Sequence, residues 1–176
     1  LALARDTFDH VSFDLIYALP GQTLAAWKDE LGRALAEAGE HLSLYQLTVE
    51  PQTPFAALRE VGRLTTPDEA SARDLYDLTR DLCAGAGMPA YEISNHARPA
   101  AECRHNLIYW RGGEYAGVGP GAHGRLDIGG DRHATATEKR PEPWLMRVEA
   151  FGHGIVTDEI LNREERGDEF LLMGLR

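Results

Sequence analysis

The spacing of apolar residues predicts a strand followed by a helix near the start of the chain. Residues 11–19 (VSFDLIYAL) form a nearly continuous apolar run that ends at a Pro-Gly pair, which is typical of a strand covered on both faces. Thr23 can then cap a helix that Gly39 ends. One face of this helix is apolar, because three- and four-residue spacings separate Leu24, Trp27, Leu31, Leu35 and Ala38.

The same alternation continues to about residue 94. Residues 41–49 (HLSLYQLTV) predict a second strand and residues 54–62 a short helix. A longer helix is expected next, with Thr66 as its cap, Pro67 at its first position and Glu69 completing a capping box. Its buried stripe is predicted to contain Leu75, Leu78 and Leu82. Residues 89–94 (PAYEIS) predict a third strand.

Strands that alternate with helices at this spacing predict right-handed βαβ units and a parallel sheet. Ligands of such sheets bind beyond the carboxyl ends of the strands. We therefore expect three polar loops to share one site: residues 19–23 (LPGQT), 48–54 (TVEPQTP) and 94–99 (SNHARP). Each loop is also compatible with an ordinary turn, so this expectation rests on the fold alone.

The pattern changes after Pro99. A short helix or turn is predicted within residues 101–115, and the glycines of residues 117–124 (GVGPGAHG) indicate positive φ or a close backbone approach. Residues 125–143 are expected to contain a hairpin and a linker. Two helices are predicted in the remainder, one over residues 143–154 and one from residue 166.

Composition narrows the function classes. The net charge is −10, from 18 basic and 28 acidic residues, which argues against a general nucleic-acid surface. No apolar run approaches the roughly 20 residues of a membrane helix, and the start lacks a signal-peptide core. Sparse cysteine suits a cytoplasmic protein. Because the chain begins without Met and stops inside a helical pattern, we expect it to be a fragment.

The two cysteines, Cys83 and Cys103, form no zinc or iron–sulfur set. Cys83 lies inside a helical pattern and is expected to be a buried small hydrophobe. Cys103 is expected to be a loop thiol, with a ligand role as the alternative.

Residues 104–110 (RHNLIYW) carry the densest candidate chemistry. His105 and Asn106 are adjacent, and Tyr109 and Trp110 follow one helical turn later. The cluster indicates either a metal or cofactor ligand with aromatic walls, or a buried histidine beside an ordinary aromatic core. The residues alone leave both interpretations open.

Five motifs in order carry a resemblance to a known family. Residues 13–23, 41–55, 91–99, 104–110 and 115–124 together resemble the HemW branch of the radical SAM superfamily, which is related to the oxygen-independent coproporphyrinogen III dehydrogenase HemN. The resemblance implies an α/β fold, the second half of a partial (β/α)₆ TIM-like barrel followed by the start of a C-terminal HemN-type domain. The implied division is residues 1–99 for the half-barrel, 100–163 for the HNxxYW and glycine-rich segment with linker and helix, and 164–176 for the C-terminal start.

The resemblance also implies two cofactors, S-adenosylmethionine and a [4Fe–4S] cluster. By correspondence with the family, Gln22, Arg33 and Ala97 are expected to contact S-adenosylmethionine; a turn-capping role for Gln22 and a surface role for Arg33 are the alternatives. The family's acidic contact has no secure match. The family's cluster-binding Cys-x₃-Cys-x₂-Cys loop is absent, so we expect the cluster in the parent protein only and assign no catalytic residue.

In HemW-like proteins the histidine of the shared His-Asn-x-x-Tyr-Trp pattern is implicated in heme binding. The resemblance therefore makes His105 the expected ligand of heme iron, with Tyr109 and Trp110 against the porphyrin and Asn106 orienting the histidine or a propionate. His123 is a competing ligand. His96, His133 and His153 are expected to be structural or solvated.

Three functions are compatible with these residues. The leading hypothesis is a heme chaperone that delivers heme to acceptor apoproteins and reaches membranes only through a partner. The alternative is an oxygen-independent coproporphyrinogen III dehydrogenase, so whether the protein is an enzyme stays open. The third is an inactive structural remnant whose unpaired strand edge would make it dimerise or aggregate. The HNxxYW motif favours the chaperone.

Overall fold

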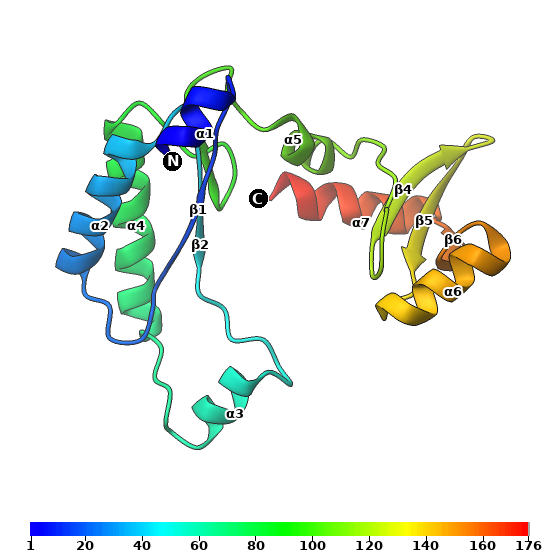
Figure 1. Cartoon of the computed structure of the whole chain (residues 1–176), viewed down its shortest axis with the longest axis horizontal. Coiled ribbons are helices and arrows are strands. Elements are labelled where there is room, and N and C mark those ends of the chain that lie inside the picture. The colour runs from blue at the N-terminus through cyan, green and yellow to red at the C-terminus, as the bar shows by residue number, and fades with distance from the viewer. Residues whose placement is uncertain (176) are drawn as a thin grey trace. The chain divides into compact units, whose positions relative to one another are not determined.

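Two three-stranded sheets organise the chain, one in each of two structural units (Figure 1). The computed structural model describes residues 1–175. The first unit runs from Leu1 to Cys103 and the second begins at Arg104. Among the described residues, no helix is long and apolar enough to cross a membrane. The three-part division expected from the family resemblance stays a prediction.

The first unit is a small sheet with two long helices beside it. Its elements are α1 (Ala2–Thr7), β1 (Asp14–Tyr17), α2 (Leu24–Glu37), β2 (His41–Gln46), α3 (Pro54–Glu60), α4 (Glu69–Gly85) and β3 (Asn95–Ala97). The strand order is β1-β2-β3, and β1 and β2 are parallel as predicted. Figure 1 shows α2 and α4 side by side. Thr23 caps α2 by accepting a hydrogen bond from the Ala26 N–H, which confirms the predicted helix start.

The core lies between the sheet and these helices. The largest fully buried side chains include Trp27, Leu31, Leu42, Leu44, Leu75 and Cys83. Trp27 stacks on Tyr17 with ring centroids 5.3 Å apart, and its indole N–H donates to the Thr79 hydroxyl at 2.8 Å. That hydroxyl donates in turn to the Leu75 carbonyl oxygen at 2.7 Å, so the polar groups of Trp27 and Thr79 are both hydrogen-bonded.

The prediction that the first strand is covered on both faces is wrong. Ile16 of β1 pairs with Tyr45 of β2, and the two side chains are 51% and 43% exposed. Their strand neighbours Tyr17 and Leu44 are buried, because successive side chains of a strand point to opposite faces. The helices therefore cover one face only.

The predicted third strand is also wrong in place and direction. Residues 89–94 turn back on themselves, because the buried carboxylate of Glu92 accepts hydrogen bonds from the Ser94 N–H at 2.8 Å and the Asn95 side chain at 2.5 Å. The strand is β3, and it runs antiparallel to β2 with Ala97 opposite His41. The loop at residues 94–99 thus lies at the amino end of β2. The prediction that it shares one site with residues 19–23 and 48–54, which follow the carboxyl ends of β1 and β2, is wrong.

The start of α4 differs from its prediction by two residues. Asp68, not Thr66, is the cap, and its carboxylate accepts from the Ser71 N–H at 2.8 Å. This hydrogen bond lowers the pKa of Asp68. A carboxylate forms a stronger, charge-assisted cap than a threonine hydroxyl, so Pro67 precedes the helix instead of opening it.

The second unit packs helices around an antiparallel sheet. Its elements are α5 (Arg104–Trp110), β4 (His123–Ile128), β5 (Asp131–Thr137), α6 (Pro141–Phe151), β6 (Ile155–Ile160) and α7 (Arg163–Gly174), and the strand order is β4-β5-β6. The hairpin turns at Gly129 and Gly130, both with positive φ. The helices and the hairpin were predicted from the sequence, whereas β6 was not.

We predict that Thr79→Val destabilises the first unit by about 1–3 kcal/mol, because it leaves the buried Trp27 indole N–H without an acceptor. Urea unfolding followed by tryptophan fluorescence measures the change. Thr65→Val, at an exposed threonine, is the matched control and should leave the midpoint unchanged. Equal midpoints for the two variants would show that the Trp27–Thr79 bond contributes nothing.

We also predict that the two thiols react at very different rates. Cys83 is fully buried and burial raises its pKa to about 12, whereas Cys103 is only partly buried. A thiol reagent followed by peptide mass spectrometry should label Cys103 in the folded chain and Cys83 only after denaturation. Equal rates in the folded chain would contradict the buried placement.

The sign of the associated pH dependence follows from the raised pKa. Stability contributed by the protonated Cys83 thiol is fully present below the unfolded pKa of about 8.5 and is lost as pH rises toward the folded value. Unfolding free energy should therefore fall as pH rises from about 8.5 toward about 12, and Cys83→Ala should lack this part of the fall.

Candidate functional site

The motif residues His105, Asn106, Tyr109 and Trp110 all lie on α5, a helix of 7 residues. Helices this short are not stable alone in water, so α5 depends on its end and its packing. After Trp110 the chain reverses at Gly112, whose φ is 61°. The Gly112 N–H donates to the Tyr109 carbonyl oxygen at 3.0 Å, and the Gly113 N–H donates to that of Ile108 at 2.7 Å. Glycine is needed at this left-handed position.

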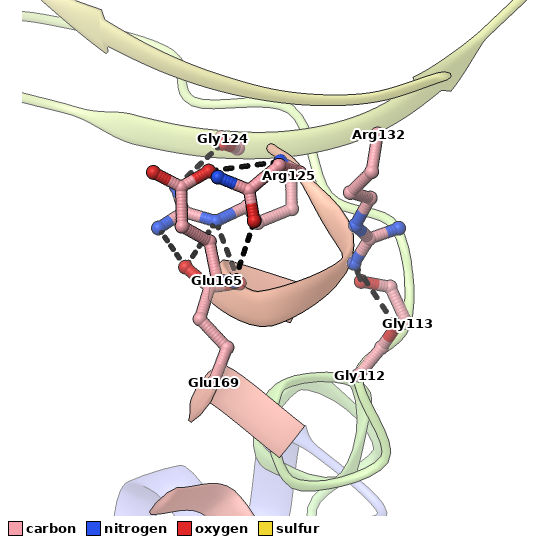
Figure 2. A network of polar contacts seen from close by, with 8 residues as sticks. Gly112, Gly113, Gly124, Arg125, Arg132, Glu165 and Glu169 are labelled. Carbon is pink, nitrogen blue, oxygen red and sulfur yellow. Dashed lines mark hydrogen bonds and ion pairs between the residues drawn. The ribbon is translucent and has the colours of Figure 1, made fainter. Parts of the chain in front are cut away.

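A buried arginine holds this helix end in place. Figure 2 shows the Arg132 guanidinium of β5 pointing at the Gly112 and Gly113 carbonyl groups. One of its terminal nitrogens donates to the Gly112 oxygen at 2.9 Å and the Gly113 oxygen at 2.7 Å, and the other pairs with Asp127 at 3.2 Å. A cation at the carboxyl end of a helix also suits the helix dipole. Arg132 was not singled out by the sequence, because nothing in its local pattern distinguishes it from a surface arginine.

Three aromatic rings extend from α5 toward the sheet. The Tyr109 hydroxyl lies 3.1 Å from His105 Nε2, and the two rings meet edge to face at 4.9 Å. On its other side Tyr109 contacts the Tyr115 ring, with centroids 4.4 Å apart. Backbone hydrogen bonds of 2.8 Å in both directions join Tyr115 to Arg125 of β4. The i, i+4 spacing predicted that His105 and Tyr109 share a helix face, but Tyr115 was not predicted.

His105 is exposed, so the alternative of a buried histidine bonded to backbone is wrong. Its imidazole is bonded to the Tyr109 hydroxyl, which a competing ligand can displace. Asn106, Tyr109 and Trp110 are partly buried. The helix therefore combines one accessible imidazole with three side chains that pack while keeping some surface.

A cavity of about 200 Å³ lies beside Tyr109, between α5, the hairpin and α7. Its lining contains Tyr115, Arg125, Arg166 and Glu169 among others. Arg125 and Glu169 form a two-pronged ion pair with distances of 2.6–3.2 Å, visible in Figure 2. This pairing raises the pKa of Arg125, and burial raises the pKa of Tyr115. Both groups therefore keep their ordinary charge near neutral pH.

The glycine-rich segment packs tightly against the hairpin, as predicted. A Cβ atom on Gly117 would lie 2.5 Å from the His123 carbonyl oxygen, and one on Gly124 would lie 2.6 Å from the Thr135 hydroxyl. The Gly121 N–H donates to the Glu138 carbonyl oxygen, and the Ala122 N–H donates to the Thr137 hydroxyl. These two N–H groups are therefore not available to an anion. His123 is exposed at the first position of β4.

The structure does not bring the three expected S-adenosylmethionine contacts together. Gln22 follows the carboxyl end of β1. Its side-chain oxygen accepts a hydrogen bond from the Leu19 N–H, and its side-chain nitrogen donates to the Glu30 carboxylate. Ala97 is buried opposite His41, at the amino end of β2. With about 3.3 Å per strand residue, the two ends of β2 lie about 16 Å apart. Arg33 is exposed on α2. The assignment of these residues stays a proposal.

An open cleft of about 950 Å³ in the first unit does lie at the carboxyl ends of β1 and β2. It is lined by residues that follow these strands, Ala18 and Leu47, by Thr66 just before α4, and by α4 residues that include Arg73 and Asp77. The position matches the one where ligands bind in parallel α/β sheets. The predicted loops at residues 19–23 and 48–54 begin just beyond the lining residues, and the contribution of α4 was not predicted.

The residues of this chain do not fit an iron–sulfur cluster. Cys83 is buried in the core and Cys103 lies at the far end of the first unit. Within residues 1–175, no three His, Cys, Asp or Glu side chains gather as a metal site would require. His96 is buried, with its pKa lowered chiefly by desolvation, and His133 pairs with Asp158 at 2.7 Å. Structural roles for these two histidines agree with the prediction.

Comparison with known proteins places these features in a family. A Mus musculus protein named radical S-adenosyl methionine domain-containing protein 1, mitochondrial, is 41% identical over 181 residues, covering all of this chain and 41% of its own length. A Bacillus subtilis protein named heme chaperone HemW is 37% identical over 169 residues, covering 96% and 44%. The chain belongs to the HemW-type radical SAM family. It spans about two fifths of the length of these curated relatives. No protein-family model matches it.

The HemW-type chain also shares its fold with a solved structure. Coproporphyrinogen III oxidase (HemN) from Escherichia coli, described as a radical SAM enzyme, matches 93% of this chain and 39% of its own chain with a TM-score of 0.71. At 20% identity this likeness shows the fold alone. It confirms the predicted α/β class and the radical SAM partial barrel.

We predict that Arg132→Gln loosens α5, because it removes the charged donor to two carbonyl oxygens and the ion pair with Asp127. The free energy of unfolding of the second unit should fall by about 2–3 kcal/mol. Hydrogen exchange of the α5 amides, read by mass spectrometry, should accelerate. Arg140→Gln, at an exposed arginine, is the control. Unchanged exchange in α5 would contradict the role given to Arg132.

Proposed function

We propose that this chain contributes the heme-binding part of a heme chaperone. The observation that carries the proposal is the exposed imidazole of His105 on a short helix fixed by Arg132 and Tyr115. A neutral imidazole is a good axial ligand for heme iron. A relative that aligns with 96% of this chain is named heme chaperone HemW, which supports the same role here.

The surroundings of His105 suit a porphyrin. Tyr109 and Trp110 are only partly buried, and the adjacent Ile108 is 37% exposed, so flat apolar surface remains for a macrocycle. Arg104 and Arg111 flank the helix and are exposed, as partners for propionate carboxylates should be. Asn106 can orient the imidazole or bind a propionate through its amide. The donors present therefore fit heme as cargo.

S-adenosylmethionine and a [4Fe–4S] cluster are implied by the family. When bound, this pair supplies reductive cleavage of S-adenosylmethionine. We propose Gln22, Arg33 and Ala97 as its nucleotide contacts in the parent protein, with the cluster held by residues outside this chain. The alternative function, an oxygen-independent coproporphyrinogen III dehydrogenase, needs that cluster for chemistry and gives no reason for an exposed His105.

The remaining expectations stay proposals. We propose that heme-accepting apoproteins are the partners and that any membrane association arises through them. A dimer is proposed through the unpaired edge of β1, the outer strand of the first sheet. We propose a cytoplasmic location, although one of the relatives named above is mitochondrial.

The test is a hemin titration followed by Soret absorbance, with circular dichroism as the folding check. We expect saturable binding by the chain and a loss of about tenfold or more in affinity for His105→Ala, since a metal–ligand bond is removed. His153→Ala, at an exposed histidine of the same unit, is the matched control and should bind as the unaltered chain does.

His123→Ala decides between the two candidate ligands. If His123→Ala abolishes the Soret shift and His105→Ala does not, the ligand has been assigned wrongly. If the folded chain binds no hemin, the proposed function fails. The dehydrogenase alternative is then testable only with the cluster-binding cysteines present.

A further inference from the structure

We propose that the Tyr109 hydroxyl is a displaceable cap on the nitrogen of His105 that coordinates heme iron, and that it sets how easily heme leaves. This inference rests on the proposed function. It goes further by assigning Tyr109 a role opposite to that of a simple aromatic wall: the ring supports the porphyrin, whereas the hydroxyl competes with iron.

The geometry of the pair is specific to one nitrogen. The Tyr109 oxygen lies 3.1 Å from Nε2 of His105, the imidazole nitrogen farthest from the backbone. The rings are nearly perpendicular, at 87°, so the hydroxyl meets the imidazole edge and not its face. In one tautomer Nε2 accepts from the hydroxyl, and in the other it donates to it. Coordination of iron through Nε2 must break this contact in either case.

The cap is held from behind, so it returns when heme departs. Tyr115 contacts the opposite side of the Tyr109 ring at 4.4 Å. Tyr115 is fixed by two backbone hydrogen bonds to Arg125, whose side chain is bound by Glu169. The helix beneath is fixed by Arg132. The hydroxyl therefore occupies a set position next to Nε2.

A chaperone has to release its cargo, and a built-in competitor lowers the net affinity without removing the ligand. A hydrogen bond between neutral groups contributes modestly in partly exposed positions, which corresponds to a change of about three- to tenfold in an equilibrium constant. Tyr109→Phe keeps the ring and its contact with Tyr115 and removes only the competing oxygen.

We expect Tyr109→Phe to bind hemin about three- to tenfold more tightly than the unaltered chain and to pass it more slowly to apomyoglobin added in excess. The Soret maximum should stay where His105 places it. Tyr45→Phe is the matched control, because it removes the hydroxyl of an exposed tyrosine in the first unit; it should change neither quantity. Equal or weaker hemin binding by Tyr109→Phe, with the fold intact, would overturn the cap.

A second readout does not depend on heme. Diethylpyrocarbonate modifies accessible imidazole nitrogens, and peptide mass spectrometry can follow the rate at His105 against the rate at His153 in the same chain. Tyr109→Phe should raise the His105 rate, whereas Tyr45→Phe should not. If no variant binds hemin but the His105 rate rises, the proposed function fails and the cap stands. If the rate does not rise, the cap itself is wrong.

Discussion

The contact on which the second unit depends is that between the Arg132 guanidinium and the carbonyl oxygens of Gly112 and Gly113. A helix of 7 residues leaves most of its backbone groups without partners inside the helix. The buried Arg132 guanidinium donates hydrogen bonds to the carbonyl oxygens of the turn that follows α5, and so connects α5 to β5. His105, Tyr109 and Trp110 therefore have fixed directions, although they belong to an element that could not persist alone. The exposed imidazole of His105 is thus supported by a buried arginine.

The second unit has a local cluster of positive charge, although the chain as a whole is negatively charged. The protein carries a net charge of −10, yet α5 is flanked by Arg104 and Arg111 and the adjacent cavity is lined by Arg125, Arg132 and Arg166. Two of these cavity arginines are already engaged, with Glu169 and Asp127. Arg104, Arg111 and Arg166 are exposed and can pair with an anionic ligand such as a propionate. An acidic surface with a local basic rim favours a bound dianion at that rim and discourages nucleic acid elsewhere.

The sequence predicted those features that depend on local periodicity or on one strong signal. Thr23, the apolar stripe around Trp27 and Leu31, and the shared helix face of His105 and Tyr109 follow from spacing alone. Predictions from the sequence were wrong where a hydrogen bond from a particular side chain determined the local backbone structure. The buried Glu92 carboxylate turned an apparent strand into a reversal, and Asp68 displaced Thr66 as a cap. Arg132 and Tyr115 could not be found in advance, because their importance comes from contacts across 20 and 6 residues that leave no periodic trace.

The close packing of Gly117 and Gly124 gives the glycine-rich segment a different role from that of the neighbouring His-Asn-x-x-Tyr-Trp motif on α5. Even a methyl group at either position would collide with the hairpin, so these glycines are dictated by how the backbone layers meet and by no ligand. His105, in contrast, is exposed and could be replaced without disturbing the packing. A related chain could therefore lose the histidine proposed here as a heme ligand and still keep these glycines. The glycine motif indicates the fold, and only the α5 residues bear on the proposed heme binding.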